Sequence, residues 1–181
     1  MQVYLKLILD INNMDIIKNK KQENINISIS EHFKFVDFAC PCCNQVLINR
    51  HLVDKLEQLI AIINTNINII NAFKCNKFNN IDIDNKKDYT LGNIVDFDLN
   101  GNKNAIETFI NTTKIFNKVG LLYNNENRAI IHVNINSDEK NSYWLCNKVN
   151  GVAKYTYFTA IEHLLAYINI DKSIDWNKLI I

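Results

Sequence analysis

The stretch Tyr89-Thr-Leu-Gly-Asn-Ile-Val-Asp-Phe-Asp98 predicts a buried strand that carries two carboxylates. Its acids, Asp96 and Asp98, alternate with apolar residues and therefore project from one face of the strand. A second apolar run, Ala129-Ile-Ile-His-Val-Asn134, carries an imidazole at His132. Burying either group without a partner costs several kcal/mol, so each requires a hydrogen bond, a counter-charge or a metal ion. We therefore predict that these strands bring polar groups together inside the fold.

Composition and charge indicate an ordinary globular domain. The chain has 181 residues, of which 48% are hydrophobic and 22% are charged, and its net charge is +1. Such a balance gives no bulk attraction to nucleic acid or to an anionic membrane, so neither is an expected partner. The apolar run at residues 3–9 is too short for a secretory signal, and no run reaches the length of a membrane span. We expect a chain made in the cytoplasm without a signal peptide.

Hydrophobic spacing predicts the elements. Asn49 can cap the clearest helix, whose apolar face comprises Leu52, Val53, Leu56, Leu59, Ile60 and Ile63. Further helices are predicted at 104–116 and 158–168, and strands at 67–73, 91–99, 119–123, 128–135, 143–149 and 152–158. Asn150-Gly151 is a strong hairpin signal between the last two strands. This order predicts an α+β fold, with a mostly antiparallel sheet and helices packed on one face.

The predicted organisation has three parts. Residues 1–30 form an N-terminal ribbon made of strands at 3–9 and 25–30. Residues 31–160 form the main domain, and residues 161–181 form a C-terminal helix and tail packed on it.

Four segments, taken in order, resemble the M15 family of zinc peptidases, which includes D-alanyl-D-alanine carboxypeptidases and phage endolysins. These segments are Phe38-Ala-Cys-Pro-Cys-Cys43, the helix start Ile48–Leu56, Ala72-Phe-Lys-Cys75 with Asn79, and the pair Tyr89–Asp96 and His132-Val-Asn134. The corresponding motifs of the family are Phe-x-Cys-x-Cys, a helix with a Leu-Val pair, Ser-Gly-Tyr-Arg-Cys, and His-x-x-Gly-x-Ala-x-Asp followed by His-x-Asp. The resemblance implies a DD-carboxypeptidase/Hedgehog-like fold over residues 32–158.

Carried over residue by residue, the resemblance implies an incomplete active site. The family binds zinc through His, Asp and His, and these positions are Tyr89, Asp96 and His132 here. Its substrate-binding Arg is matched by Lys74, which cannot grip a carboxylate in the same bidentate way. The position of its acid/base carboxylate is occupied by Ala129, which leaves Glu126 as the candidate.

Two interpretations of the Asp96 and His132 pair remain open. One is an Asp–His contact between neighbouring strands, with a hydrogen bond from Tyr89. The other is a bound metal ion with Asp88 or Tyr89 as the third ligand. A shifted register could exchange Asp98 for Asp96.

The cysteines also allow alternatives. Cys40, Cys42, Cys43 and Cys75 could form a thiolate zinc site, a disulfide, or a set of small buried thiols. The Cys-x-Cys-Cys spacing is tighter than the usual Cys-x-x-Cys knuckle, which favours buried thiols. We expect Cys146 to pack in the predicted hairpin.

Other side chains have simple interpretations. The histidines His32, His51 and His163 are isolated in the sequence. Aromatic residues gather on the predicted hairpin, where they either stabilise strand pairing or form a partner surface: Tyr143, Trp144, Tyr155 and Tyr157.

The positions that differ from the family pattern are the zinc-ligand, substrate-binding and acid/base positions. We therefore expect a non-catalytic M15-like protein that serves as a structural or binding module of a phage or prophage particle. Its partners would be other particle proteins or peptidoglycan, and it would need no cofactor. One alternative is an active zinc peptidase that cuts peptidoglycan peptides. A second is an interaction module built on a zinc–thiolate centre.

Overall fold

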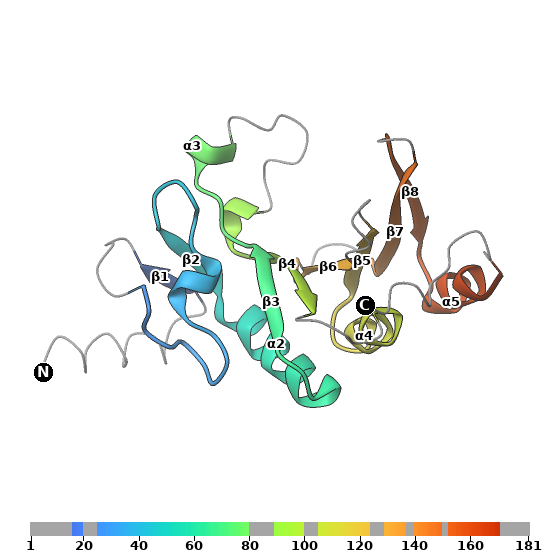
Figure 1. Ribbon diagram of the computed structural model, residues 1–181, viewed down its shortest axis with the longest axis horizontal. Helices are drawn as coiled ribbons and strands as arrows, with labels where there is room; N and C mark the ends of the chain where they lie inside the picture. The colour runs from blue at the N-terminus through green and yellow to red at the C-terminus, as the bar shows by residue number, and fades with distance from the viewer. Residues whose placement is uncertain are drawn as a thin grey trace, which may run out of the picture. The chain divides into compact units, whose positions relative to one another are not determined.

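A computed structural model describes residues 16–19, 25–79, 89–99, 105–123, 129–136, 140–149 and 152–170 (Figure 1). The elements run in the order β1 (Ile16–Asn19), η1 (Phe35–Phe38), β2 (Val46–Asn49), α2 (Arg50–Ile63), β3 (Ile67–Asn71), α3 (Asn76–Asn79), η2 (Tyr89–Leu91), β4 (Ile94–Leu99), α4 (Ala105–Thr113), β5 (Lys118–Tyr123), β6 (Ala129–Asn134), β7 (Ser142–Val149), β8 (Val152–Phe158) and α5 (Ile161–Ile170).

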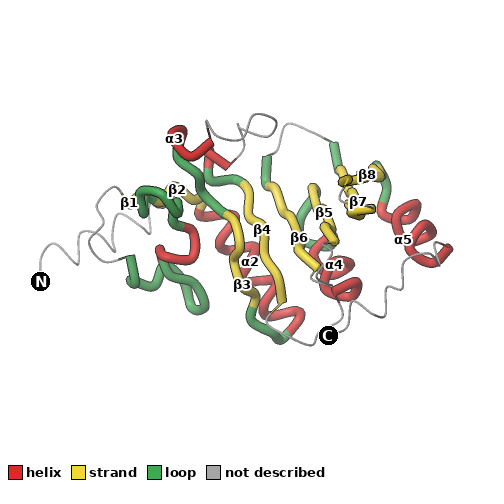
Figure 2. Tube along the Cα trace, turned by 45° about the horizontal axis from the view of Figure 1, so that its top comes forward, coloured by secondary structure: helices red, strands yellow, loops and turns green. Residues whose placement is uncertain are grey.

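The main sheet has six strands in the order β3-β4-β6-β5-β7-β8 (Figure 2). Strand β5 is antiparallel to β6 and parallel to β7, and β7 is antiparallel to β8. A second sheet pairs β1 with β2. The predicted α+β class with a mostly antiparallel sheet is confirmed, with β5 and β7 as a parallel pair.

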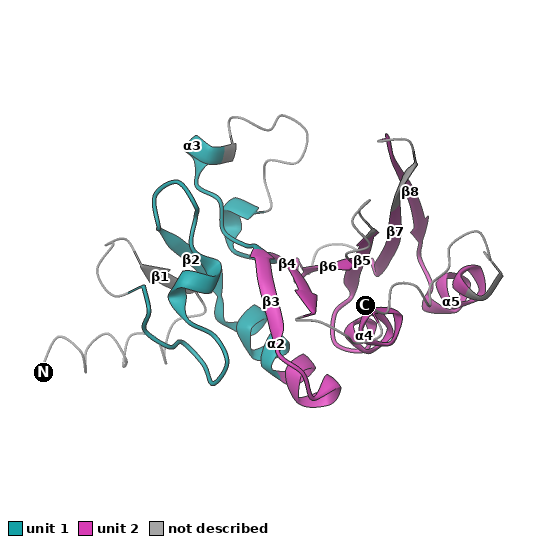
Figure 3. Cartoon of the chain, viewed as in Figure 1, with its two compact units in different colours: residues 1–57, 71–94 teal, residues 58–70, 95–181 magenta. Residues whose placement is uncertain are grey.

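The described chain divides into two compact units (Figure 3). Unit 1 comprises residues 1–57 and 71–94, and unit 2 comprises residues 58–70 and 95–181. The boundaries run through helix α2 and near the ends of β3 and β4, so each unit is built from segments that are separate in the sequence.

Unit 1 has an aromatic core next to a well-capped helix. Phe35 and Phe38 are buried in η1, and the rings of Phe33 and Phe38 meet edge to face with their centres 5.4 Å apart. At the start of α2, the backbone N–H of His51 donates to Oδ1 of Asn49 over 2.9 Å, which confirms the predicted cap.

The predicted N-terminal ribbon is corrected in part. Residues 25–30 form turns and one isolated bridge between Ser28 and Lys34. The backbone groups of this stretch form hydrogen bonds with η1 and with the turn before it, instead of with another strand. The strand that does form is β1, which pairs with β2 in the register Ile16–Asn49 to Asn19–Val46. The predicted strand at 3–9 lies outside the described residues.

Glycine at position 92 fits a close approach of two backbones within unit 1. Gly92 has φ of +69°, and a Cβ there would meet the backbone of Leu47 and Ile48. Its carbonyl also accepts a hydrogen bond of 2.9 Å from the N–H of Asn49. This approach ties the turn before β4 to the end of β2.

In unit 2, alternation along the strands separates two faces of the sheet. The first face is apolar and buried, and comprises Val95, Phe97, Val119, Leu121, Ile131, Val133 and Leu145. Helix α4 contacts β5, and α5 contacts β7 and β8. Both helices lie on the same side of these strands (Figure 1). The second face carries Asp96, Gly120, His132 and Trp144. Among the helices of the described residues, none has the length and apolar character needed to cross a membrane.

Candidate metal centre and the Asp96–His132 pair

Four cysteines converge in unit 1 from two separate segments. Cys40, Cys42 and Cys43 lie in the turn between η1 and β2, which is closed by hydrogen bonds of 2.9 Å from Cys40 N–H to Gln45 and from Asn44 N–H to Cys40. Asn44 has φ of +54°, a left-handed conformation that Asn tolerates. The fourth cysteine, Cys75, lies between β3 and α3.

The sulfur atoms are close enough to share one ion. All four Sγ atoms lie within 4.8 Å of one another. The Sγ of Cys42 lies 3.4 Å from that of Cys40 and 3.3 Å from that of Cys75. Zinc–sulfur bonds of about 2.3 Å place tetrahedral ligands about 3.8 Å apart, and the observed spacing surrounds that value. The cluster can therefore hold a metal ion.

Backbone donors and neighbouring thiols set the acidity of the cluster. The hydrogen bond from the backbone N–H of Phe78 is the main cause that lowers the pKa of Cys75, to about 7. Hydrogen bonds with the other thiols lower it further. The N–H of Cys75 itself points to Sγ of Cys40 at 3.4 Å. The hydrogen bond with the thiol of Cys75 is the main cause that raises the pKa of Cys42, to about 12. The lowered pKa of Cys75 favours the thiolate form that a metal ligand must adopt, whereas the raised pKa of Cys42 opposes it.

The prediction of four small buried thiols is wrong in one respect. Cys40 is fully buried, but Cys42 is exposed and the other two are half-buried, so solvent reaches the cluster. The thiols are free, so the predicted disulfide alternative is not present. Cys146 is not a member of this cluster, and it is buried in β7, within the predicted hairpin.

In unit 2, Asp96 and His132 meet directly. A hydrogen bond of 2.7 Å joins Oδ1 of Asp96 on β4 with Nδ1 of His132 on β6. Asp96 is buried and His132 half-buried, so this is a partly desolvated pair. The expected Asp–His contact between neighbouring strands is thus present, and it uses Asp96 rather than Asp98, which is buried two residues further along β4.

Aromatic rings extend from this pair along the same face. The ring centres of His132 and Trp144 are 5.3 Å apart, and those of Trp144 and Tyr155 are 5.6 Å apart. Tyr155 and Tyr157 stack at 6.1 Å on β8, where both are exposed. The predicted aromatic cluster on the hairpin therefore forms, except that Tyr143 is buried on the opposite face.

Lys74, the candidate substrate-binding residue, lies against two aromatic rings. The ammonium of Lys74 lies 4.8 Å from the ring centre of Tyr89 and 5.7 Å from that of Phe78, all within unit 1. This is a cation–π arrangement, so Lys74 and Tyr89, two of the candidate site residues predicted from the sequence, lie in contact. Glu126 and Asp88 lie outside the described residues.

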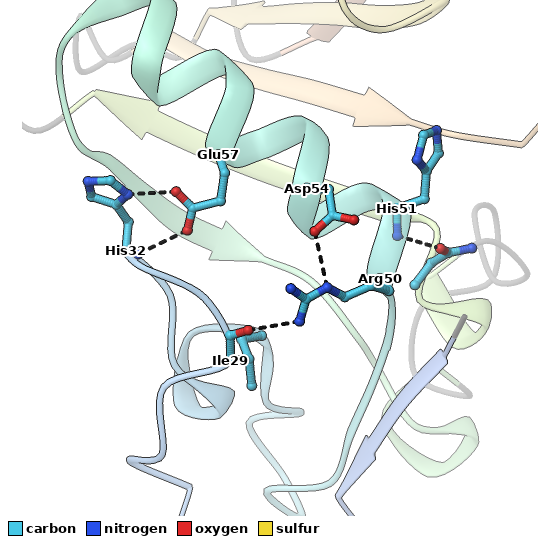
Figure 4. Close-up of polar contacts among 7 residues, drawn as sticks. Ile29, His32, Arg50, His51, Asp54 and Glu57 are labelled. Atoms are coloured by element: carbon cyan, nitrogen blue, oxygen red, sulfur yellow. Dashed lines mark hydrogen bonds and ion pairs between the residues drawn. The ribbon is translucent and has the colours of Figure 1, made fainter. Parts of the chain in front are cut away.

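Polar contacts at α2 were not anticipated from the sequence (Figure 4). Nδ1 of His32 lies 2.6 Å from Oε2 of Glu57, and the N–H of His32 donates to Oε1 over 2.9 Å. Arg50 bonds with Asp54 and with the carbonyl of Ile29, each over 3.0 Å. His32 was predicted to be isolated, and that is wrong. Its partner lies 25 residues away, so no local pattern marks the pair.

The chain matches no family model, no curated protein and no solved structure.

Proposed function

We propose that the chain is a non-catalytic binding or structural module of the M15 peptidase type, in which the four-cysteine cluster holds a structural zinc ion. The observation that carries the metal centre is the convergence of four Sγ atoms within 4.8 Å. Four thiolates match the closed, tetrahedral ligand set of structural zinc sites, which keep no open position for a reacting water.

A metal ion there would tie two parts of unit 1 together. Cys40, Cys42 and Cys43 precede β2, whereas Cys75 follows β3. A folded chain presents these four ligands together and an unfolded chain does not, so metal binding stabilises the fold. This gives the cluster a structural role without any reaction.

The arrangement of Asp96 and His132 supports the absence of catalysis. Their facing atoms, Oδ1 and Nδ1, are joined to each other at 2.7 Å. A zinc ion held by this pair would need further ligands, and the family's first ligand position is occupied by Tyr89, a rare zinc ligand. The acid/base position is Ala129. These substitutions favour a fold retained without its reaction.

Our proposal for the partner rests on the resemblance in sequence. Phage lysis and virion proteins belong to the family that the motifs resemble, so we propose a component of a phage or prophage particle that contacts other particle proteins or peptidoglycan. An exposed pair of stacked tyrosines, Tyr155 and Tyr157, supports a surface role, because aromatic residues are enriched at interfaces.

The metal content of three variants tests this proposal. We expect the purified wild-type chain to contain about one zinc ion, as a single tetrahedral site requires. His132→Ala should keep this zinc, whereas the double variant Cys42→Ser, Cys75→Ser should lose it. Cys146→Ser is the matched control, because it removes a thiol outside the cluster and should leave the zinc content unchanged.

The opposite pattern would favour the active peptidase. Zinc that is lost in His132→Ala but retained in the cysteine double variant would place the ion at Asp96 and His132. That result, together with cleavage of peptidoglycan peptides, would reject the non-catalytic proposal. Absence of metal from the wild type, after expression with added zinc, would reject the thiolate centre.

A further inference from the structure

We propose that Cys42 and Cys75 are a peroxide-oxidisable pair, and that the disulfide between them releases the metal ion from the cluster. This inference rests on the proposed zinc centre and adds a modification site to it. The reactant is a peroxide, and the product is a reversible cross-link between two segments of unit 1.

The geometry selects this pair among the four thiols. The Sγ atoms of Cys42 and Cys75 lie 3.3 Å apart, the shortest sulfur–sulfur distance measured among the described residues. A disulfide has a sulfur–sulfur bond of about 2.05 Å, so the two atoms need to approach by little more than 1 Å. The exposed Cys42 is the member that a dissolved oxidant reaches first.

Cys40 is a poorer partner for Cys42 despite a similar sulfur–sulfur distance of 3.4 Å. Its side chain is fully buried, and only Pro41 separates it from Cys42. A disulfide across one residue closes a small ring that departs from the usual Cβ–S–S–Cβ geometry. Cys75 comes from another segment, 33 residues away, and carries no such constraint.

Disulfide formation is a two-electron oxidation, and hydrogen peroxide is the oxidant. In the zinc-loaded cluster Cys42 is a thiolate because a metal ligand must be deprotonated. This thiolate attacks one oxygen of hydrogen peroxide, the O–O bond breaks, and a sulfenic acid and hydroxide form. The Cys75 thiolate then attacks the sulfenic sulfur, forming the S–S bond and expelling a second hydroxide. Two thiolates are oxidised by two electrons in total, and the peroxide is reduced. Cys40 and Cys43 remain as the only two thiolates of the cluster, too few for a closed tetrahedral zinc site.

The experiment follows zinc and disulfide together. The zinc-loaded full chain is treated with hydrogen peroxide, released zinc is measured with a chromogenic chelator, and the cross-link is mapped by mass spectrometry of peptides prepared under acid quench. We expect zinc release in step with a Cys42–Cys75 link, at about one ion per link, and rebinding after dithiothreitol. Cys146→Ser removes a thiol outside the cluster and should leave both the link and the zinc release unchanged.

The possible failures are distinguishable. If the chain binds zinc but keeps it under peroxide, or loses it with Cys40–Cys42 or Cys42–Cys43 as the mapped link, this inference is rejected and the zinc centre stands. If the chain binds no zinc, the proposed centre is rejected. In that case the same mapping on the metal-free chain still decides whether Cys42 and Cys75 are the oxidisable pair.

Discussion

The indole of Trp144 on β7 lies against the backbone of Gly120 on β5, its register partner in the parallel strand pair. A Cβ at position 120 would overlap the indole atoms Cζ2, Cε2 and Cδ2. His132 is the partner of Gly120 on the other side, in β6, and its ring is 5.3 Å from the indole. The missing side chain at 120 therefore lets Trp144 reach across β5 to the Asp96–His132 pair.

Replacing Gly120 with alanine should displace the indole. We expect Gly120→Ala to lower the free energy of unfolding by about 1–3 kcal/mol, as overpacking does elsewhere, because the ring must move or the strands must shift. Urea unfolding measures this cost. Since the chain has two tryptophans, a Trp176→Phe background lets the fluorescence report on Trp144 alone.

A double-mutant cycle supplies the control. In a Trp144→Leu background the ring is absent, so Gly120→Ala should cost much less. An equal cost in both backgrounds would show that the backbone at 120, rather than the indole, requires glycine.

Much of the fold is predictable because its signals are local. Helix α2 follows from apolar spacing and from the Asn49 cap, and the β7–β8 hairpin follows from Asn150-Gly151 between two alternating runs. The pairing of β1 with β2 and the parallel pairing of β5 with β7 are not local. The sequence of each strand does not indicate which strand it pairs with, so both pairings are determined by tertiary packing.

The candidate site was predictable in its members but not in its arrangement. Polar residues at Asp96 and His132 are conspicuous in apolar strands, and their contact follows from the cost of burial. The cysteine cluster was underestimated, because Cys75 is remote and Cys-x-Cys-Cys is not a standard knuckle. The stacking of Trp144 on Gly120 depends on the strand order, which cannot be predicted from local sequence patterns.

Removing the cap of α2 should destabilise unit 1. Asn49→Ala loses the hydrogen bond to the N–H of His51, and the loss of a comparable cap costs about 0.5–2 kcal/mol. Asn66→Ala, at an exposed position between α2 and β3, is the matched control and should change the unfolding midpoint little. A similar shift for both variants would argue against the cap.

The His32–Glu57 pair should make stability depend on pH. The hydrogen bond with Glu57 is the main cause that raises the pKa of His32 above 6.5. Burial raises the pKa of Glu57, but the nearby hydroxyl of Ser30 and the hydrogen bonds from His32 outweigh it and hold that pKa below 4.5. The histidine's contribution is complete below about pH 6.5 and is lost as pH rises through its native pKa. The glutamate's contribution is complete above about pH 4.5 and is lost as pH falls through its native pKa.

The coupling between the two side chains should therefore be greatest between about pH 4.5 and 6.5 and decline on both sides. A double-mutant cycle of His32→Asn and Glu57→Gln, followed by urea unfolding from pH 3 to 9, measures this coupling directly. A coupling free energy that stays constant across that range would contradict the ion pair.

Removing the metal should loosen unit 1 selectively. The proposed ligands join the turn at residues 40–45 to the segment at residues 72–78, so chelation removes the link between them. We expect amide exchange in both segments to rise at least about tenfold with EDTA, as expected for local opening, while β5 and β7 in unit 2 keep their protection. The double variant Cys42→Ser, Cys75→Ser should exchange rapidly with or without EDTA. Equal acceleration in both units would mean that the ion stabilises the whole chain, and no acceleration would mean that the cysteines hold the turn without it.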